Sequence, residues 1–215
     1  MSRPVTEPSF TPGLRAATTE PEAGESHHLL RFSGLDLTDA SLRRAEWEEC
    51  VLHDVALTDA ELTGSRWLDV RLDQVRVTTS DLRGTHWRDA VVVESRFAGV
   101  EAYESSWTSC EFHRCRFASV NLRGARLRDV SFIECDLRDL DLAGAVLEQV
   151  RFTGSALAGA RFAHASMHEV DLSDASLLHV ADGIDGLRGS TVSRPQLEGM
   201  LDGMATALGI TVAEA

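Results

Sequence analysis

Two cysteines and a histidine lie within six residues of one another, at Cys110, His113 and Cys115. Thiolate and imidazole are ligands that Zn²⁺ prefers in proteins, so this cluster is a candidate metal site. Binding one ion requires all three side chains to converge on one point. The direction of each side chain depends on the local backbone, for which the chain carries a strong periodic signal.

Four tryptophans, all that the chain has, are separated by steps of twenty residues: Trp47, Trp67, Trp87 and Trp107. Counting by five from residue 32 to residue 177 gives thirty positions. Twenty-nine of them carry Leu, Phe, Val, Trp or Met, and only Ala102 is small. Neither an α-helix nor a β-strand has a period of five. A repeat of five inside a repeat of twenty predicts a solenoid in which four short units close one coil.

A second series of mostly small residues lies two positions before each large apolar residue, and only Leu30, Leu35 and Leu140 depart from it. If one large and one small side chain point inward in every unit, the chain can turn a corner at each unit. The result is a square tube with parallel, hydrogen-bonded walls. Successive coils lie ~4.8 Å apart, so about seven and a half coils make a tube ~36 Å long.

The place of each large residue in the twenty-residue coil assigns it to one of four walls. The tryptophan wall collects Trp47, Trp67, Trp87, Trp107, Leu127, Leu147 and Met167, and the phenylalanine wall, next along the chain, collects Phe32, Leu52, Leu72, Val92, Phe112, Phe132, Phe152 and Leu172. Glycines share the last place of several units, at Gly64, Gly84, Gly124 and Gly144. A corner that needs a positive φ favours glycine there.

In this frame the cysteines have an ordinary role. Cys50, Cys110, Cys115 and Cys135 all occupy the small inward series and are expected to fill the core. His113 is expected to point outward, away from the thiols, so the frame argues against a metal site. Cys115 and Cys135 would lie in adjacent coils within reach of a disulfide, a bond that a cytoplasmic setting disfavours.

The same frame leaves no place for catalysis. Apolar side chains fill the interior and the outer walls are flat, whereas an active site needs polar groups that converge in a pocket. His164, His168 and His179 are expected to point outward, and no phosphate-binding loop, dinucleotide fingerprint or nucleophile elbow occurs. We predict a protein that is not an enzyme and that uses no cofactor or metal.

The chain has 34 acidic residues against 21 basic ones, all of them Arg, for a formal net charge of −13. This charge opposes direct binding to nucleic acid or to anionic membranes and favours a basic protein partner. Residues 1–27 lack the apolar region of a signal peptide, and no run approaches the roughly eighteen apolar residues of a membrane span. We therefore expect a cytoplasmic location.

Three regions follow from these patterns. Residues 1–28 contain four of the five prolines among polar residues and are expected to form a disordered tail. Residues 29–182 form the tube. Residues 183–215 form a turn, a helix and a short tail, and Gly183, Gly186 and Gly189 mark the exit from the tube.

The predicted C-terminal helix begins at Ser193, which forms a capping box with Gln196 and is followed by Pro195 in the first turn. An apolar stripe at helical spacing then runs through Leu197, Met200, Leu201, Met204 and Leu208. Gly209 ends it. Since the open end of a tube exposes apolar side chains and unpaired strand edges, this helix is expected to cover that end or to join two tubes as a homodimer.

Several units spell related pentapeptides: ASLRR at 40–44, AELTG at 60–64, SDLRG at 80–84, VNLRG at 120–124, CDLRD at 135–139 and VDLSD at 170–174. They resemble the pentapeptide-repeat family, whose unit is written A(D/N)LXX, and the resemblance covers residues 30 to about 182. It implies an all-β fold, a right-handed quadrilateral parallel β-helix, here with a C-terminal α-helix. Members such as the Qnr proteins and the mycobacterial fluoroquinolone-resistance protein protect DNA gyrase and topoisomerase IV. They resemble B-form DNA and dimerise through their C-terminal ends, whereas many other members have no known role.

The acidic excess lies on two adjacent walls. Outward positions carry eight acids against four Arg on the tryptophan wall and seven against four on the phenylalanine wall. Two rows repeat at the coil step, the first acidic edge (Glu49, Asp69, Asp89, Asp129 and Glu169) and the second acidic edge (Asp54, Glu94, Glu134 and Asp174). Carboxylates ~5 Å apart in water repel by about 0.8 kcal/mol before salt screening, a cost that the fold does not need.

These rows support two functions. In the first, the protein is a DNA mimic that binds DNA gyrase or another type II topoisomerase through its acidic edges and protects it from quinolone-type or other poisons, because a DNA-binding groove lined with Arg and Lys accepts a row of anions. In the second, it is a scaffold or self-immunity protein with a different protein target. Acidic proteins carry acidic surfaces everywhere, and no motif in the chain names gyrase.

Overall fold

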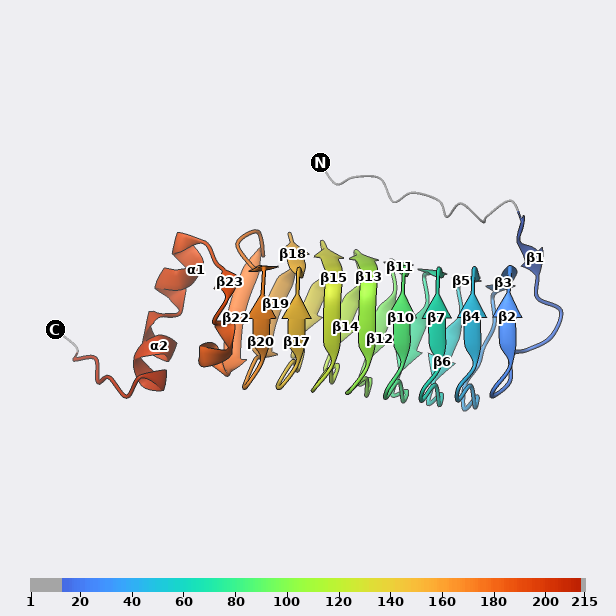
Figure 1. Cartoon of the computed structure of the whole chain (residues 1–215), viewed down its shortest axis with the longest axis horizontal. Helices are drawn as coiled ribbons and strands as arrows, with labels where there is room; N and C mark the ends of the chain where they lie inside the picture. Colours follow the sequence, from blue (N-terminus) through green and yellow to red (C-terminus); the bar gives the residue numbers. More distant parts are fainter. Residues whose placement is uncertain (1–12, 214–215) are drawn as a thin grey trace.

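The computed structural model describes residues 13–213, which form a long tube of short parallel strands with two small helices at the C-terminal end (Figure 1). The predicted fold, a quadrilateral parallel β-helix followed by a helical end, is confirmed. The coil length is confirmed as well, because residues twenty apart pair along the tube, as Trp47, Trp67 and Trp87 do.

The strands of the tryptophan wall are β2 (Ser26–His28), β4 (Glu46–Glu48), β7 (Arg66–Leu68), β10 (His86–Arg88), β17 (Val146–Glu148) and β20 (Ser166–His168). Two longer strands, β13 (Ser106–His113) and β15 (Arg126–Ile133), continue through the corner. Their first halves belong to the tryptophan wall and their second halves to the phenylalanine wall.

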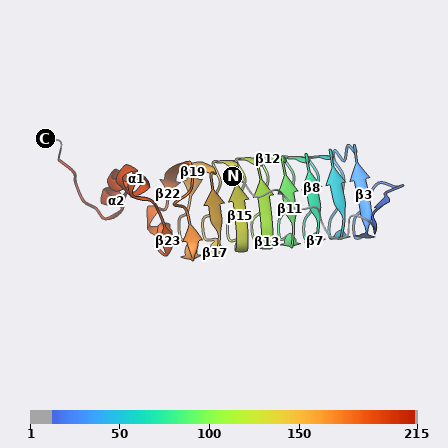
Figure 2. The same ribbon diagram turned by 90° about the horizontal axis from the view of Figure 1, so that it is seen from above.

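The strands of the phenylalanine wall, several of which are labelled in Figure 2, are β1 (Arg15–Ala16), β3 (Leu30–Ser33), β5 (Val51–His53), β8 (Arg71–Asp73), β11 (Val91–Val93), β18 (Arg151–Thr153), β21 (Val170–Asp171) and β23 (Ser190–Thr191). This wall extends one strand beyond the repeat at each end, because β1 pairs with β3 and β23 pairs with β21.

The third wall is a separate sheet of β6 (Ala56–Thr58), β9 (Arg76–Thr78), β12 (Arg96–Ala98), β14 (Arg116–Ala118), β16 (Asp136–Arg138), β19 (Ala156–Arg161) and β22 (Leu177–Asp182). The fourth wall is held by single bridges, such as Asp81 to Glu101. Here the second residue of the unit braces the turn: the Asp81 carboxylate accepts from the Arg83 amide at 3.0 Å, and the Asn121 side chain accepts from the Arg123 amide at 3.1 Å. This contact explains the preference for Asp or Asn at that place.

Both inward series fill the core. The large residues stack in columns, with Trp47 and Trp67 ring centroids 4.8 Å apart and Trp67 and Trp87 centroids 4.9 Å apart in nearly parallel planes. Trp107 is tilted by 54° against Trp87. Phe112 and Phe132 stack in the same way on the next wall, at 5.1 Å. Because each ring packs on its counterparts one coil away, the core is continuous along the tube.

The small inward residue has a second task beneath two of the four tryptophans. Trp67 Nε1 donates to Ser65 Oγ at 2.8 Å, and Trp87 Nε1 donates to the Thr85 hydroxyl at 3.1 Å. Trp47 has Ala45 at the corresponding place, and its buried Nε1 has no acceptor among residues 13–213. A buried donor without a partner lowers stability, so the tryptophan column is not equally satisfied along its length.

Each corner from Gly24 to Glu169 is made by a residue with positive φ at the last place of the unit. Gly64 (φ 70°) and Gly124 (φ 63°) have this conformation as predicted. Non-glycine residues hold it at most other corners, including Asp69 (φ 50°) and Glu94 (φ 48°). Left-handed backbone is unfavourable for most side chains, so the inward packing on both sides of each corner must hold it in place.

The tube begins earlier than predicted. The expected tail up to residue 28 is wrong for its described part, because β1 and β2 pair with the first repeated coil; residues 1–12 lie outside the described residues. His27 is 7% exposed and continues the tryptophan column, its ring 4.5 Å from that of Trp47. The apolar repeat did not predict this coil, because the imidazole of His27 fills the position of a large apolar side chain.

The five-residue repeat shifts its register by one residue in the last coil. Leu177, the last position counted in the beat, is 50% exposed, and Leu178 instead pairs with the inward Leu157. The shift is visible at Asp174, since the Gly154 amide donates to a carbonyl twenty residues later, whereas the equivalent bond from Gly64 to Arg83 spans nineteen. Ala156 accordingly pairs with Leu177, twenty-one residues later. The prediction of Leu177 as an inward residue is therefore wrong.

Three glycines let the C-terminal segment approach the last coil. A Cβ atom on Gly183 would lie 2.0 Å from the Ala163 nitrogen, and one on Gly186 would lie 2.0 Å from the Phe162 carbonyl oxygen. Gly189 meets the last coil in the same way. The short 3₁₀-helix η2 (Ile184–Leu187) lies directly on the end of the tube. The predicted exit glycines thus mark a tightly fitted cap.

The prediction of one continuous C-terminal helix is wrong. The structure has α1 (Arg194–Gly199) and α2 (Leu201–Ala207), separated at Met200. The capping box is present, because Gln196 Oε1 accepts from the Ser193 amide at 2.8 Å. Met200 leaves helical geometry (φ −101°, ψ 0°) while its side chain is buried. A helix with glycine at 199 and 203 is intrinsically weak, so burial of Met200 decides the break.

Replacing Ser65 by Ala should leave the Trp67 N–H without an acceptor and lower the free energy of unfolding by about 1–3 kcal/mol. Ala45→Ser places a hydroxyl at the same position under Trp47 and should raise it by about 0.5–1.5 kcal/mol. Urea unfolding followed by tryptophan fluorescence measures both. If both substitutions changed the free energy of unfolding by the same amount and in the same direction, the hydroxyl would not act as the acceptor of the tryptophan N–H.

Gly186→Ala should detach the cap, because the neighbouring atom is backbone and cannot move aside. We expect faster amide hydrogen exchange in residues 183–207 and a loss of about 1–3 kcal/mol in stability. Gly199→Ala is the matched control, since its Cβ would meet nothing within 4 Å. It should stabilise by up to about 1 kcal/mol. Unchanged exchange in Gly186→Ala would show that the cap does not depend on this contact.

Candidate functional site

The predicted acidic residues lie at the corners of the tube. The first acidic edge runs along the corner between the tryptophan and phenylalanine walls. Glu49, Asp69 and Asp89 lie on successive coils, and Ser109 and Gln149 precede Asp129 and Glu169 in the same row. Asp174 departs from the second edge: it lies where the beat slips, lacks the positive φ of the other corner residues, and its carbonyl accepts from the Gly154 amide. The structure therefore brings eight of the nine residues into two rows.

The first acidic edge concentrates charge in the N-terminal half of the tube, where three carboxylates lie on successive coils. Asp69 lies between Glu49 and Asp89 on adjacent coils. Partial burial raises the pKa of the Asp69 carboxyl, and repulsion from Glu49 and Asp89 adds to this. The raised pKa means that ionised Asp69 opposes folding, and its penalty appears as pH rises through the folded-state pKa. The fold thus pays for this charge.

Contacts along the first acidic edge are otherwise local. His28 Nε2 lies 3.2 Å from Glu49, and the Gln149 side chain donates to Glu169 at 2.9 Å. Arg88 Nε lies 3.6 Å from Asp89 and is itself exposed. Such surface contacts contribute little to stability. The edge therefore keeps most of its negative field toward solvent.

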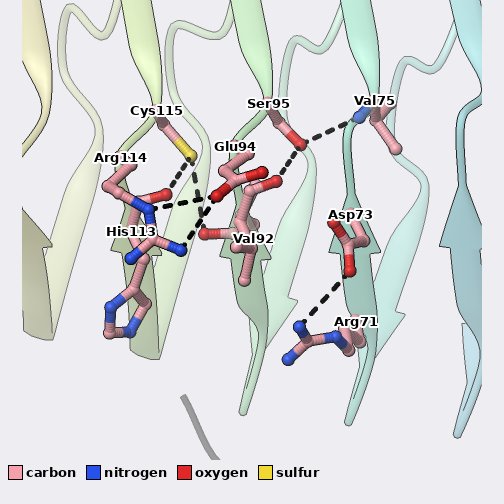
Figure 3. Close-up of polar contacts among 10 residues, drawn as sticks. Arg71, Asp73, Val75, Val92, Glu94, Ser95, His113, Arg114 and Cys115 are labelled. Carbon is pink, nitrogen blue, oxygen red and sulfur yellow. Dashed lines mark hydrogen bonds and ion pairs between the residues drawn. The ribbon is translucent and has the colours of Figure 1, made fainter. Parts of the chain in front are cut away.

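The second acidic edge is partly neutralised. Arg76 of the third wall lies 3.0 Å from Asp54. Arg114, which occupies a corner of this same edge, binds Glu94 through Nε and Nη2 at 3.2 and 3.0 Å (Figure 3). The Arg114 hydrogen bond lowers the pKa of Glu94. The two edges, equal in the sequence interpretation, therefore differ in available charge.

The positive φ of the corners is itself one reason for acidic residues there. Asp adopts the left-handed region more readily than most residues, so the corner itself favours Asp. Corner aspartates also occur on the third wall, at Asp39, Asp59 and Asp139. Glu gains no such advantage, yet Glu49 and Glu94 hold the same conformation. Backbone preference therefore explains part of each row.

The outer face of the tryptophan wall is of mixed charge. Next to the first acidic edge lies a shallow depression lined by outward side chains, among them Arg66, Leu68, His86 and Arg88. Arg66 lies 3.3 Å from Glu46, and Arg128 lies 3.7 Å from Glu148. The acidic excess of this wall consequently resides at its corner.

The C-terminal apolar stripe divides into two sets. Met200 is buried and Met204 is half-buried against the end of the tube, so these two side chains cover it. Leu197, Leu201 and Leu208 are exposed by 41, 57 and 74%. The helices thus cap the tube with one face and leave an apolar face toward solvent.

The residues of the candidate metal site do not converge. The four thiols are free and buried, and burial raises the pKa of Cys110 to about 12. Cys115 Sγ lies 3.5 Å from the Val92 carbonyl (Figure 3), and its hydrogen bond with Cys135, followed by burial, raises the pKa of Cys115. His113 points outward but is covered, with Nε2 2.8 Å from Glu111. Within residues 13–213, no group of three or more His, Cys, Asp or Glu side chains is placed to hold a metal.

Among the described helices, none has the length and apolar character to span a membrane.

Comparison with solved structures returned several pentapeptide repeat proteins. Full-length QnrB1, a plasmid-mediated fluoroquinolone resistance protein, has a TM-score of 0.41 at 18% identity, over 83% of this chain and 99% of that one. HetL of the cyanobacterium Nostoc sp., involved in heterocyst differentiation regulation, has a TM-score of 0.38 at 16% identity, over 79% and 90%. A comparison with curated proteins found no match.

Family models match two stretches of the tube. The model for pentapeptide repeats in eight copies matches residues 31–66, and the model for a pentapeptide repeat region matches residues 105–181. Together they cover more than half of the chain, and the paired register of the walls continues through the interval between them. The chain therefore belongs to the pentapeptide-repeat family.

Proposed function

We propose that this protein binds a type II topoisomerase, DNA gyrase or topoisomerase IV, by presenting the first acidic edge in place of the DNA backbone. The observation that carries the proposal is the column Glu49, Asp69 and Asp89. These carboxylates lie on successive coils of the tube, ionised Asp69 opposes folding, and the contacts of Glu49 and Asp89 with His28 and Arg88 are surface ion pairs of small energy. A groove lined with Arg and Lys that binds duplex DNA would accept such a row.

The second acidic edge has a smaller part in this proposal. Since Arg76 and Arg114 already bind Asp54 and Glu94, a partner would have to displace both guanidinium groups to use those carboxylates. Exchange of one ion pair for another yields little free energy. We therefore assign recognition to Glu49, Asp69, Asp89 and Asp129, on a cytoplasmic, non-enzymatic protein.

A supercoiling assay with purified gyrase tests the proposal. At micromolar concentrations the protein should either inhibit supercoiling or, in the presence of a quinolone, reduce the amount of cleaved DNA. Binding should weaken as salt is raised, because both partners exchange counterions. Neither effect at micromolar protein would contradict topoisomerase binding and favour the alternative, a scaffold or self-immunity protein with another target.

Reversal of charge on the first acidic edge should abolish binding while the tube remains folded. The variant is Asp69→Arg, Asp89→Arg and Asp129→Arg, and we expect at least a hundredfold loss of affinity by fluorescence anisotropy. Arg is compatible with these corners, because Arg44 and Arg114 hold the same positive φ. The matched control carries Asp39→Arg, Asp59→Arg and Asp139→Arg at corners of the third wall. Equal losses in both variants would assign binding to net charge alone.

We also propose that the exposed face of α1 and α2 joins two chains end to end. Leu197, Leu201 and Leu208 form the contact, and Met200 and Met204 remain on the tube. Apolar side chains exposed to this degree at the end of a rod favour self-association.

Leu201→Asp should convert the dimer to a monomer, since a carboxylate would have to be buried in an apolar contact. Multi-angle light scattering gives the mass directly. Leu177→Asp, at an exposed leucine on the third wall, is the control and should leave the mass unchanged. A wild-type chain that is monomeric at tens of micromolar would refute the dimer.

A further inference from the structure

The cap at the C-terminal end of the tube leaves the third wall open. On the other walls, β23 pairs with β21, η2 lies on β20, and Gly186 packs against Phe162. β22 is the last strand of the third-wall sheet, and no strand within residues 13–213 pairs with its outer edge. The third wall therefore ends in a free strand edge.

The inward side chains of β22 lack the cover that earlier strands provide for one another. Leu157 of β19 is fully buried, whereas its partner Leu178 in β22 is half-buried. The same difference separates Ala160 from its partner Val180. With six residues, β22 is also longer than most strands of its sheet. A long edge strand with apolar side chains favours pairing with a further strand.

This edge is accessible from solvent. A groove open to solvent runs between β22 and α2, with residues 180–182 on one side and Gly203 and Thr206 on the other. A segment that pairs with β22 would lie in this groove.

The chain carries a short segment that suits the edge. Ile210, Thr211 and Val212 follow α2, adopt no regular structure and lead away from the tube (Figure 1). The Ile210 and Val212 side chains are 57 and 64% exposed. All three residues are β-branched, which favours a strand. The two apolar side chains are two positions apart, as Leu178 and Val180 are, so a strand can place one pair over the other.

We propose that residues 210–212 of one chain pair with the free edge of β22 in a second chain, as a parallel strand with Ile210 over Leu178 and Val212 over Val180. The inference rests on the end-to-end dimer proposed above, in which the C-terminal ends of two chains face each other. It adds a reciprocal exchange of strands to the contact between the helices.

The parallel register also assigns a role to the Thr211 amide. In the repeat, the residue before an inward centre donates to the previous coil, as the Arg76 amide does to the Val55 carbonyl at 2.9 Å. Backbone groups two residues apart in a strand face the same way, so the residue after the centre also donates to the previous coil. With Ile210 as the centre, the Thr211 amide donates to β22.

Photochemical cross-linking in the full-length chain tests where the segment lies. With p-benzoylphenylalanine in place of Val212, an equimolar mixture of ¹⁵N-labelled and unlabelled chains is irradiated and the products are mapped by mass spectrometry. We expect cross-links to residues 177–182 that join a labelled to an unlabelled chain. Cross-links within one chain only, or to other elements only, would overturn the proposal.

Substitution of Thr211 tests the strand without altering the helices. In Thr211→Pro, amides of residues 177–181 should exchange hydrogen about fivefold or more faster than in the wild type, because proline removes the donor to β22. Thr211→Val is the matched control: it keeps the N–H and the β-branched shape, and exchange should be unchanged. Equal exchange in both variants would overturn the proposal.

Light scattering separates this inference from the dimer on which it rests. Thr211→Pro should keep the mass of a dimer through Leu197, Leu201 and Leu208. A wild-type dimer in which residues 177–181 exchange as fast as in Thr211→Pro would refute the strand exchange alone. A wild-type monomer would refute both the dimer and the exchange.

Discussion

In all but the last coil of this protein, each inward side chain stacks on the residue twenty places further along the chain. The ladder spacing between coils is fixed by backbone hydrogen bonds, so each ring in a column meets its neighbour at 4.8–5.2 Å where the planes are parallel. The twenty-residue register is kept without insertion until the last coil, where one extra residue shifts it. The same spacing applies to the outer surface. A residue type that recurs every twenty positions therefore forms a straight row whose members lie one coil apart.

The rigid pitch explains why the fold could be predicted so fully from sequence, and where the prediction stopped. Inward positions admit few residue types, so the five-residue apolar repeat could be recognised from Phe32 to Leu172. His27 fills an inward position with a polar ring, so the apolar pattern did not include it. The register shift at the last coil places Leu178 where Leu177 was expected, which leaves the apolar pattern intact while it turns Leu177 outward. Both errors arise where a different side chain satisfies the same packing requirement.

The candidate site was predicted less well, because outward residues obey no such requirement. Rows of carboxylates were visible in the sequence, whereas their ion pairs depend on side chains that reach across a corner, as Arg76 does to Asp54. One distinction was nevertheless accessible. Arg114 stands within the second acidic edge at the coil step, whereas the first acidic edge has only Ser109 and Gln149 between its carboxylates. Counting every residue of a row, including the cations, would have separated the two edges.

The remaining question is whether the first acidic edge needs a partner to explain it. Corner geometry accounts for Asp in a left-handed position, but neutral residues serve equally well there, as Gln74, Thr79 and Ser109 do. Charge is therefore not required by the backbone, and at Asp69 it opposes folding. Three consecutive carboxylates, at Glu49, Asp69 and Asp89, add repulsion that a single neutral residue in the middle would remove. Charge that weakens the fold and that the backbone does not require is the reason for proposing a cationic partner surface.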